Sequence, residues 1–273
     1  MEGRNMKAVQ KTVPMALAAV LCAAASGQGA ESAVVDLKLA STDARSFRGL
    51  NADDKGLVEI KPFANAAGRL TFRVAADSVR ADTNGDGTVD DADAPAVKPQ
   101  RTTIAVAARC GTTAIEYPVE ILFVRGTMLV VGSRARMEGR WNDRVVGIGD
   151  ANLDGVFGNK GDTLSIAAAG PAGGPGAAVS LPWSRTIGVD ARLYSIAMEG
   201  ADKLRIEAYK GAVSELRFAM EPAPGEVGLQ LINEEASFCT TVRSIAEPVR
   251  AVPGTCRLYG TFGWEDGATR MYL

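Results

Sequence analysis

The stretch Leu70-Thr71-Phe72-Arg73-Val74 alternates apolar and polar residues and runs almost directly into the acidic loop Asp82-Thr83-Asn84-Gly85-Asp86-Gly87-Thr88-Val89-Asp90-Asp91-Ala92-Asp93. Such alternation is typical of a strand with one buried face. It recurs along the chain between Gly and Pro residues, as at 58–61, 104–110, 119–123, 194–198 and 229–231. The pattern predicts an all-β, mainly antiparallel and β-sandwich-like fold.

The acidic loop fits the calcium-loop pattern D-x-[DN]-x-[DN]-G, in which alternate residues of a tight turn aim oxygen atoms at one centre. Its carboxylates would repel one another in a compact turn without a cation. The alternative is a solvated turn rich in Asn, Gly and Asp. We predict a Ca²⁺ site with ligands from Asp82, Asn84, Asp86, the Thr88 carbonyl, Asp90 and Asp93. Because Pro95 and Pro99 follow, the loop is not expected to lead into a long helix.

A second stretch, Asp150-Ala151-Asn152-Leu153-Asp154-Gly155-Val156-Phe157, repeats the opening of that pattern. Its closing acid comes one position late, at Asp162, and Lys160 lies inside the loop. An enlarged loop could supply Asp150, Asn152, Asp154, the Val156 carbonyl and Asp162 to a second calcium ion. The alternative is a hairpin turn whose Asp and Asn side chains bond only to the backbone.

The first 30 residues have the order of a secretory signal peptide. Arg4, Lys7 and Lys11 precede the apolar run Val13–Ala25, and small residues follow it. We therefore expect residues 1–30 to be removed and the protein to be secreted or periplasmic, with no membrane span in the mature chain. The alternative is a buried N-terminal helix.

The rest of the chain is expected to divide at a stretch of Gly, Pro and Ala. Residues 169–178 are small and uncharged, and they predict a linker or a long surface loop. This gives an N-terminal β domain at 31–168 and a C-terminal β domain at 179–273, which could share one core or have two. Within the second, residues 201–217 contain helix formers, but alternation and Gly211 favour a hairpin.

Three cysteines remain beyond the signal peptide: Cys110, Cys239 and Cys256. In an oxidising compartment an odd number leaves one over. We predict a Cys239–Cys256 disulfide, subject to geometry, and a buried free thiol at Cys110.

Composition limits the chemistry. The chain has no histidine, which excludes Ser-His-Asp and Cys-His catalysis as well as histidine-ligated metal sites. No basic stripe interleaved with aromatic residues indicates a nucleic-acid partner. Candidate acids for glycosidase chemistry exist, namely Glu116, Glu120, Glu138, Glu234, Glu235 and Glu265, but aromatic residues make up only 6% of the chain. We therefore expect a non-catalytic protein.

The first loop, DTNGDGTVDDAD, resembles the calcium loops of dockerin-type, EF-hand-like repeats of extracellular bacterial proteins. More loosely, GDANLDGVFGNKGDTLSI, VDARLYSIAMEGADKLRIEAYKG and VPGTCRLYG resemble uncharacterised secreted bacterial β proteins. The resemblance implies Ca²⁺ as the bound cofactor and implies no particular activity.

These observations favour a calcium-binding β protein with a structural or adhesive role, whose partner would be an extracellular polysaccharide or protein. A carbohydrate-active enzyme or carbohydrate-binding module with structural calcium is the alternative. In a third interpretation, an exposed strand edge or residues 258–273 pair with a partner in an assembly.

Overall fold

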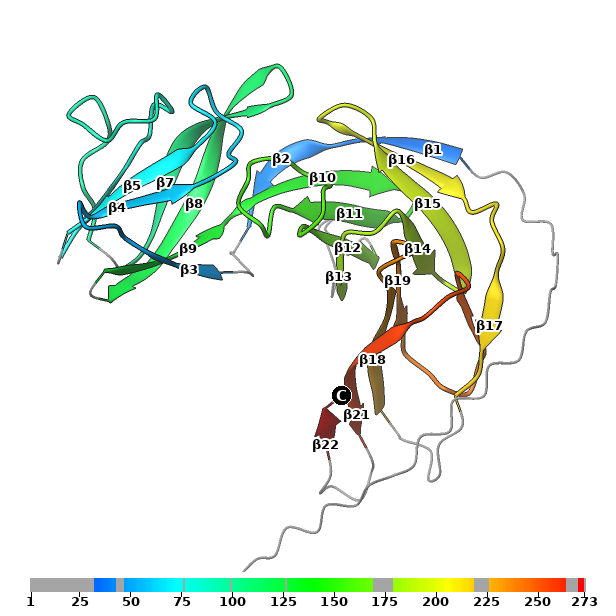
Figure 1. The fold of residues 1–273 in the computed structure, drawn as a ribbon. Helices are drawn as coiled ribbons and strands as arrows, with labels where there is room; N and C mark the ends of the chain where they lie inside the picture. Colours follow the sequence, from blue (N-terminus) through cyan, green and yellow to red (C-terminus); the bar gives the residue numbers. More distant parts are fainter. Residues whose placement is uncertain are drawn as a thin grey trace, which may run out of the picture.

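The chain is all-β. The computed structural model describes residues 32–42, 47–75, 77–98, 100–125, 127–168, 179–218, 226–263 and 270–272, and none of them is helical. The strands form several mainly antiparallel sheets (Figure 1). The predicted fold class is confirmed.

The largest sheet has its strands in the order β1-β16-β15-β14-β19-β18-β21-β22. All its pairs are antiparallel except β14 with β19, which run parallel. Its strands are β1 (Ser32–Asp36), β14 (Thr186–Val189), β15 (Arg192–Met198), β16 (Lys203–Ala208), β18 (Glu226–Asn233), β19 (Phe238–Val242), β21 (Arg257–Gly263) and β22 (Arg270–Tyr272). A short pair, β17 (Ser214–Leu216) with β20 (Val249–Ala251), lies beside it.

A five-stranded sheet, in the order β13-β12-β11-β10-β2, packs against the large one through β1 on β10 and β13 on β19. Its strands are β2 (Lys38–Ser41), β10 (Ala135–Trp141), β11 (Arg144–Gly149), β12 (Thr163–Ala168) and β13 (Val179–Pro182). Side chains of both sheets fill the space between them, as in a sandwich.

Strands β3 to β9 form a separate lobe, called here the N-terminal lobe, at the left of Figure 1. It contains a four-stranded sheet, β3-β9-β8-β7, and a three-stranded sheet, β4-β5-β6. Its strands are β3 (Phe47–Asn51), β4 (Leu57–Ile60), β5 (Leu70–Val74), β6 (Val79–Ala81), β7 (Gln100–Cys110), β8 (Thr113–Arg125) and β9 (Met128–Ser133). The stretch Leu70–Val74 is thus a strand, as its alternation predicts.

One apolar cluster joins the N-terminal lobe to both large sheets, with members as far apart in sequence as Val35, Tyr117 and Cys239. A smaller cluster lies among β15, β18, β19 and β20, and contains Leu193, Leu229 and Phe238.

The predicted division into 31–168 and 179–273 does not correspond to separate sheets. Strand β1, from the first segment, pairs with β16 of the second, and β12 pairs with β13 across the predicted linker. The linker residues 169–178 themselves lie outside the described residues. The two segments therefore share a core. The predicted hairpin within 201–217 is wrong, because β16 pairs with β15 and β1 whereas β17 pairs with β20.

The predicted Cys239–Cys256 disulfide is wrong in this structure, where both residues and Cys110 are free thiols. Strand β18 lies between the two: Ile232 pairs with Cys239 on one side and with Arg257, the neighbour of Cys256, on the other. Two strand spacings put the Cα atoms roughly 10 Å apart, which is beyond the reach of a disulfide.

No helix in the described part of the chain is long and apolar enough to cross a membrane. The predicted signal peptide at 1–30 lies outside the described residues.

Candidate functional site: two acidic loops

The first acidic loop begins directly after β6, where Asp82 is completely buried. Its Oδ1 accepts a hydrogen bond from the Gly85 N–H at 2.7 Å, and its Oδ2 accepts one from the Gly87 N–H at 2.8 Å. Both glycines have left-handed backbone angles, φ 76° and 91°, which only glycine adopts at little cost. The loop thus winds tightly around the Asp82 carboxylate.

Asp93 closes the same loop and is only 7% exposed. Its Oδ1 accepts from the Thr83 N–H at 2.7 Å, and its Oδ2 accepts from the Asp90 N–H at 2.9 Å. Burial raises the pKa of Asp82, and the negative charges of Asp93 and Asp86 raise it further. Three of the predicted ligands, Asp82, Asp86 and Asp93, are therefore close enough in this loop for their charges to interact.

The other predicted ligands of this loop lie at its surface. Asp86 is exposed, and the hydroxyl and N–H of Thr88 donate to its Oδ1, which lowers the pKa of Asp86. The Asn84 amide donates to Asp86 Oδ2 at 3.0 Å. Asp90 accepts from the Ala92 N–H. A carboxylate has about four lone-pair sites, so these bonds leave acceptor capacity for a cation. A Thr88 carbonyl ligand stays a prediction.

The second acidic loop connects β11 to β12, which form an antiparallel pair. Because Gly149 pairs with Thr163 at the end of this pair, the adjoining Asp150 and Asp162 stand opposite each other at the mouth of the loop. Each is 2% exposed. Pairing of the strand ends thus brings together the first and last predicted ligands of the late-closing loop.

Asp150 is held by donors from two parts of the chain. Its Oδ2 accepts from the Gly155 N–H at 2.7 Å and from the Tyr117 hydroxyl at 2.5 Å, and its Oδ1 accepts from the Asp154 N–H at 3.2 Å. The hydroxyls of Tyr117 and Ser133 are 2.6 Å apart. Burial raises the pKa of Asp150, although the Tyr117 and Gly155 hydrogen bonds act against it.

Asp162 is satisfied on one oxygen only. Its Oδ2 accepts from the N–H groups of Gly158 at 2.8 Å and Asn159 at 3.1 Å. Its Oδ1 is buried and has no hydrogen-bond donor. Burial above all, with the charges of Asp150 and Asp154 also contributing, raises the pKa of Asp162 to about 7. An ionised oxygen buried without a partner is costly, and a bound cation would remove that cost.

The remaining polar groups of the second loop bond to one another. Asn159 donates to Asp154 Oδ2 at 2.7 Å, and Asn152 donates to the same oxygen at 3.0 Å. Val156 is 49% exposed, and its N–H donates to Asp154 Oδ1. Lys160 is exposed, and its carbonyl accepts a hydrogen bond from the Asn152 side chain.

Sequence reasoning missed Tyr117 and Asn159. Asn159 is polar and lies within the loop, so its position could have indicated a role. Tyr117 lies on β8, 33 residues before Asp150, and no local pattern links the two.

In the described part of the chain, no three Asp, Glu, His or Cys side chains converge closely enough to hold a metal ion on their own. A cation in either loop would therefore take further ligands from amide and carbonyl oxygens and from water. Ca²⁺ accepts such mixed oxygen shells, whereas softer metals prefer nitrogen and sulfur.

The connection between β4 and β5 lies against both acidic loops. Towards the first loop, the Arg69 guanidinium donates to the Gly87 carbonyl at 3.1 Å. Towards the second, the Ala64 N–H donates to the Asp154 carbonyl at 2.8 Å. A Cβ on Gly155 would lie 3.1 Å from the Ala64 nitrogen, so the approach is close. The segment Ala64–Arg69 is therefore hydrogen-bonded to both acidic loops.

Among the residues that the structure describes, the Glu residues considered for glycosidase chemistry do not form a pair of facing carboxylates, and three of them form ion pairs with arginines. Glu120 is buried and pairs with Arg101 at 2.6 Å, Glu138 pairs with Arg136, and Glu234 pairs with Arg257. They lie in different parts of the structure, on β8, on β10 and beyond β18. Glu116 is exposed on β8, Glu235 is exposed in the β18–β19 turn, and Glu265 falls outside the described residues.

Comparison with known proteins does not add to these observations: no family model, curated protein or solved structure matches the chain. The resemblance to dockerin-type loops rests on the loop sequence alone.

Proposed function

We propose that this chain is an exported β protein that binds calcium in its acidic loops, and that the ion has a structural role. Its partner in an adhesive role would be an extracellular polysaccharide or protein. The proposal rests on two loops with the same Asp-x-Asn-x-Asp-Gly order, each starting directly after a strand.

The observation that carries the proposal is the Asp162 carboxylate. It is buried, one of its oxygens has no donor, and it faces Asp150 across the mouth of the second loop. Hydrogen bonds from Gly158 and Asn159 fix its other oxygen, so the side chain is positioned before any ion arrives. A calcium ion would compensate the charge that burial leaves unsolvated.

The first loop supports the same function by a different route. The Asp82 and Asp93 carboxylates are buried, and each of their oxygens accepts from a backbone N–H group, while Asp86 and Asp90 remain at the surface. We expect this site to be the weaker one, because its ion would sit close to solvent. Extracellular calcium modules commonly have Kd values of about 10⁻⁴ to 10⁻³ M, which plentiful external calcium saturates.

Calorimetric melting tests the structural role. At a calcium concentration about 100 times Kd, one site adds about 2.7 kcal/mol to the free energy of unfolding. For a chain of this size, that corresponds to a rise in Tm of roughly 5 to 10 °C over the value in chelator.

Two single substitutions that each remove one negative charge serve as the test and its control. Asp162→Asn should abolish most of the calcium-dependent rise, whereas Asp77→Asn, at an exposed position outside both loops, should leave it intact. Equal melting temperatures of the wild-type protein in calcium and in chelator would reject the proposal.

A further inference from the structure

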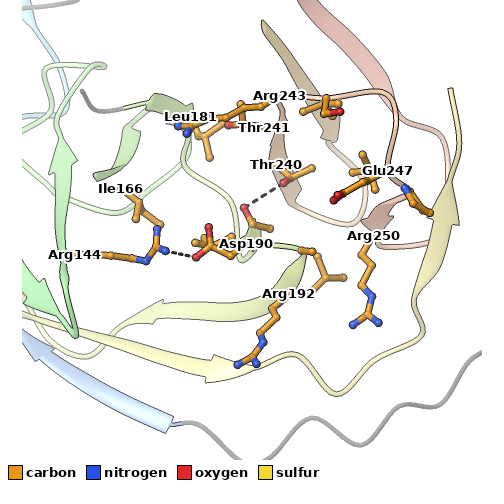
Figure 2. A pocket seen from close by; sticks show the side chains of 18 residues that line it. Arg144, Ile166, Leu181, Asp190, Arg192, Thr240, Thr241, Arg243, Glu247 and Arg250 are labelled. Carbon is orange, nitrogen blue, oxygen red and sulfur yellow. Dashed lines mark hydrogen bonds and ion pairs between the residues drawn. The ribbon is translucent and has the colours of Figure 1, made fainter. Parts of the chain in front are cut away.

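A cavity of about 290 Å³ lies where the five-stranded sheet meets β14, β15, β19 and β20. Apolar side chains form part of its lining, including Leu193 and, labelled in Figure 2, Ile166 and Leu181. None of its lining residues belongs to the acidic loops. Its volume is close to the lower end of the range for small-molecule sites.

Four arginines from different elements line this cavity: Arg144 on β11, Arg192 on β15, Arg243 just after β19 and Arg250 on β20. Only two acids, Asp190 and Glu247, line it as well. The lining therefore holds more cations than anions, although the whole chain has a formal net charge of −2. Arg192 and Arg250, like Arg144, also interact with other groups of the protein, and these interactions help to hold them at the cavity.

Some of these groups are already held in place. The Arg144 guanidinium forms an ion pair with Asp190, drawn as a dashed line in Figure 2. The Thr240 hydroxyl donates to the Gly188 carbonyl at 3.1 Å. A guanidinium has five N–H donors, so an arginine that holds one protein partner can still bind a ligand.

The turn between β14 and β15 forms one side of the cavity. Its two central residues, Asp190 and Ala191, have left-handed backbone angles, φ 49° and 58°. These are the angles of a type I′ turn, the usual two-residue connection between antiparallel strands, here between the paired residues Val189 and Arg192. The turn presents Asp190 to Arg144 and places Arg192 immediately after it, at the cavity.

We propose that this cavity binds a small anionic ligand through carboxylate or phosphate groups. The planar guanidinium matches the oxygen geometry of both groups, and paired N–H donors bind them more strongly than a point charge does. The hydroxyls of Thr241 and Ser244 supply neutral donors beside the arginines. The apolar lining would contact the ligand's uncharged part.

Ligand-observed NMR at low ionic strength tests this proposal, with inorganic phosphate and succinate as separate probes of the two anion classes. The protein is kept free of calcium, and its fold is checked by circular dichroism. We expect at least one probe to bind. The double substitution Arg192→Gln/Arg250→Gln should weaken binding roughly tenfold or more, because charge-assisted hydrogen bonds are lost.

Two further variants separate a specific site from general charge attraction. A doubly substituted control with the same charge change, Arg73→Gln/Arg109→Gln, alters exposed positions of the N-terminal lobe and should bind the probes as the wild type does. Glu247→Gln removes an exposed acid from the cavity lining and should tighten binding about threefold. A loss of stability cannot produce tighter binding, so this gain is diagnostic.

Binding of phosphate alone or of succinate alone would support the proposal and identify the anion class. The proposal would be overturned if neither probe bound, or if the cavity variants and the N-terminal-lobe control bound equally well. None of these outcomes depends on calcium binding by the acidic loops.

Discussion

Asp162 illustrates how a single buried carboxylate can link stability to pH and to a cation. The folded protein raises its pKa to about 7, mainly by burial, whereas an unfolded chain has an ordinary Asp value near 3.9. Between about pH 4 and 7 the folded state therefore holds a proton that the unfolded state has released. This residue's contribution to the free energy of unfolding falls as pH rises through that window.

We predict that in chelator the wild-type protein loses more stability between pH 5 and pH 7.5 than Asp162→Asn does. Asp82 and Asp150 also have raised pKa values, so both proteins should show some slope, and the difference isolates Asp162. Urea unfolding of both proteins at the two pH values measures the loss of stability in each. Identical slopes for the two proteins would show that Asp162 is not buried as described.

A second prediction at this scale concerns Tyr117, which is fully buried and donates to Asp150. Tyr117→Phe leaves a buried carboxylate with one donor fewer, and should cost roughly 1 to 3 kcal/mol in the free energy of unfolding. Tyr194→Phe is the control, because Tyr194 is also buried and packs edge-on against Trp141. Urea denaturation of both variants should show a clearly larger loss for Tyr117→Phe; equal losses would contradict the assigned hydrogen bond.

Individual residues also show where sequence reasoning stops. The alternate Asp and Asn residues of each loop could be placed because their hydrogen bonds are local, as from Gly85 to Asp82 or from Gly155 to Asp150. Tyr117 could not, since a contact across 33 residues depends on how β8 packs beside the second loop. The cysteine pairing failed for the same reason: spacing in sequence does not reveal that β18 intervenes.

At the scale of elements, the connection between β4 and β5 stands out. It contacts the first loop through Arg69 and the second through Ala64, and Arg48 on β3 also donates to the Asn152 carbonyl at 2.7 Å. If calcium restricts the motion of either loop, the β4–β5 connection should become less mobile too, because hydrogen bonds tie it to that loop.

Hydrogen exchange tests that coupling. We predict that calcium slows exchange at the amides of Ala64, Gly155 and Gly158, which donate within or onto the second loop. Amides in the β15–β16 pair, such as Ile206, should keep their rates. Protection confined to the loop residues, with Ala64 unchanged, would contradict the coupling.

The elements themselves were predictable to different degrees. Alternation identified strands such as Leu57–Ile60, in which Val58 and Ile60 are buried and Glu59 is exposed. It also located Leu70–Val74, although Thr71, on the polar side of that strand, is buried as well. It could not assign partners: β16 and β17 are close in sequence but belong to different sheets. Strand pairing is decided by long-range packing, which a periodic pattern does not encode.

For the whole molecule, β1 and the β12–β13 pair explain why the chain does not divide at the Gly-Pro-Ala stretch. Composition indicates a flexible segment there, yet strands on both sides complete the same sheets and one apolar cluster spans them. A stretch of small residues is thus compatible with a loop inside one fold as well as with a linker.

Calcium binding by the acidic loops is the property on which the proposed function of the whole molecule depends. Isothermal titration calorimetry of the chain from Glu31 onward, calcium-free at the start, tests it most directly, with Asp162→Asn and Asp82→Asn titrated alongside. We predict saturable binding with Kd on the order of 10⁻⁴ M for the wild type, and weaker binding, with a higher Kd, for each substituted protein. No saturable heat up to about 100 times that concentration, or an identical isotherm for wild type and both variants, would contradict the claim.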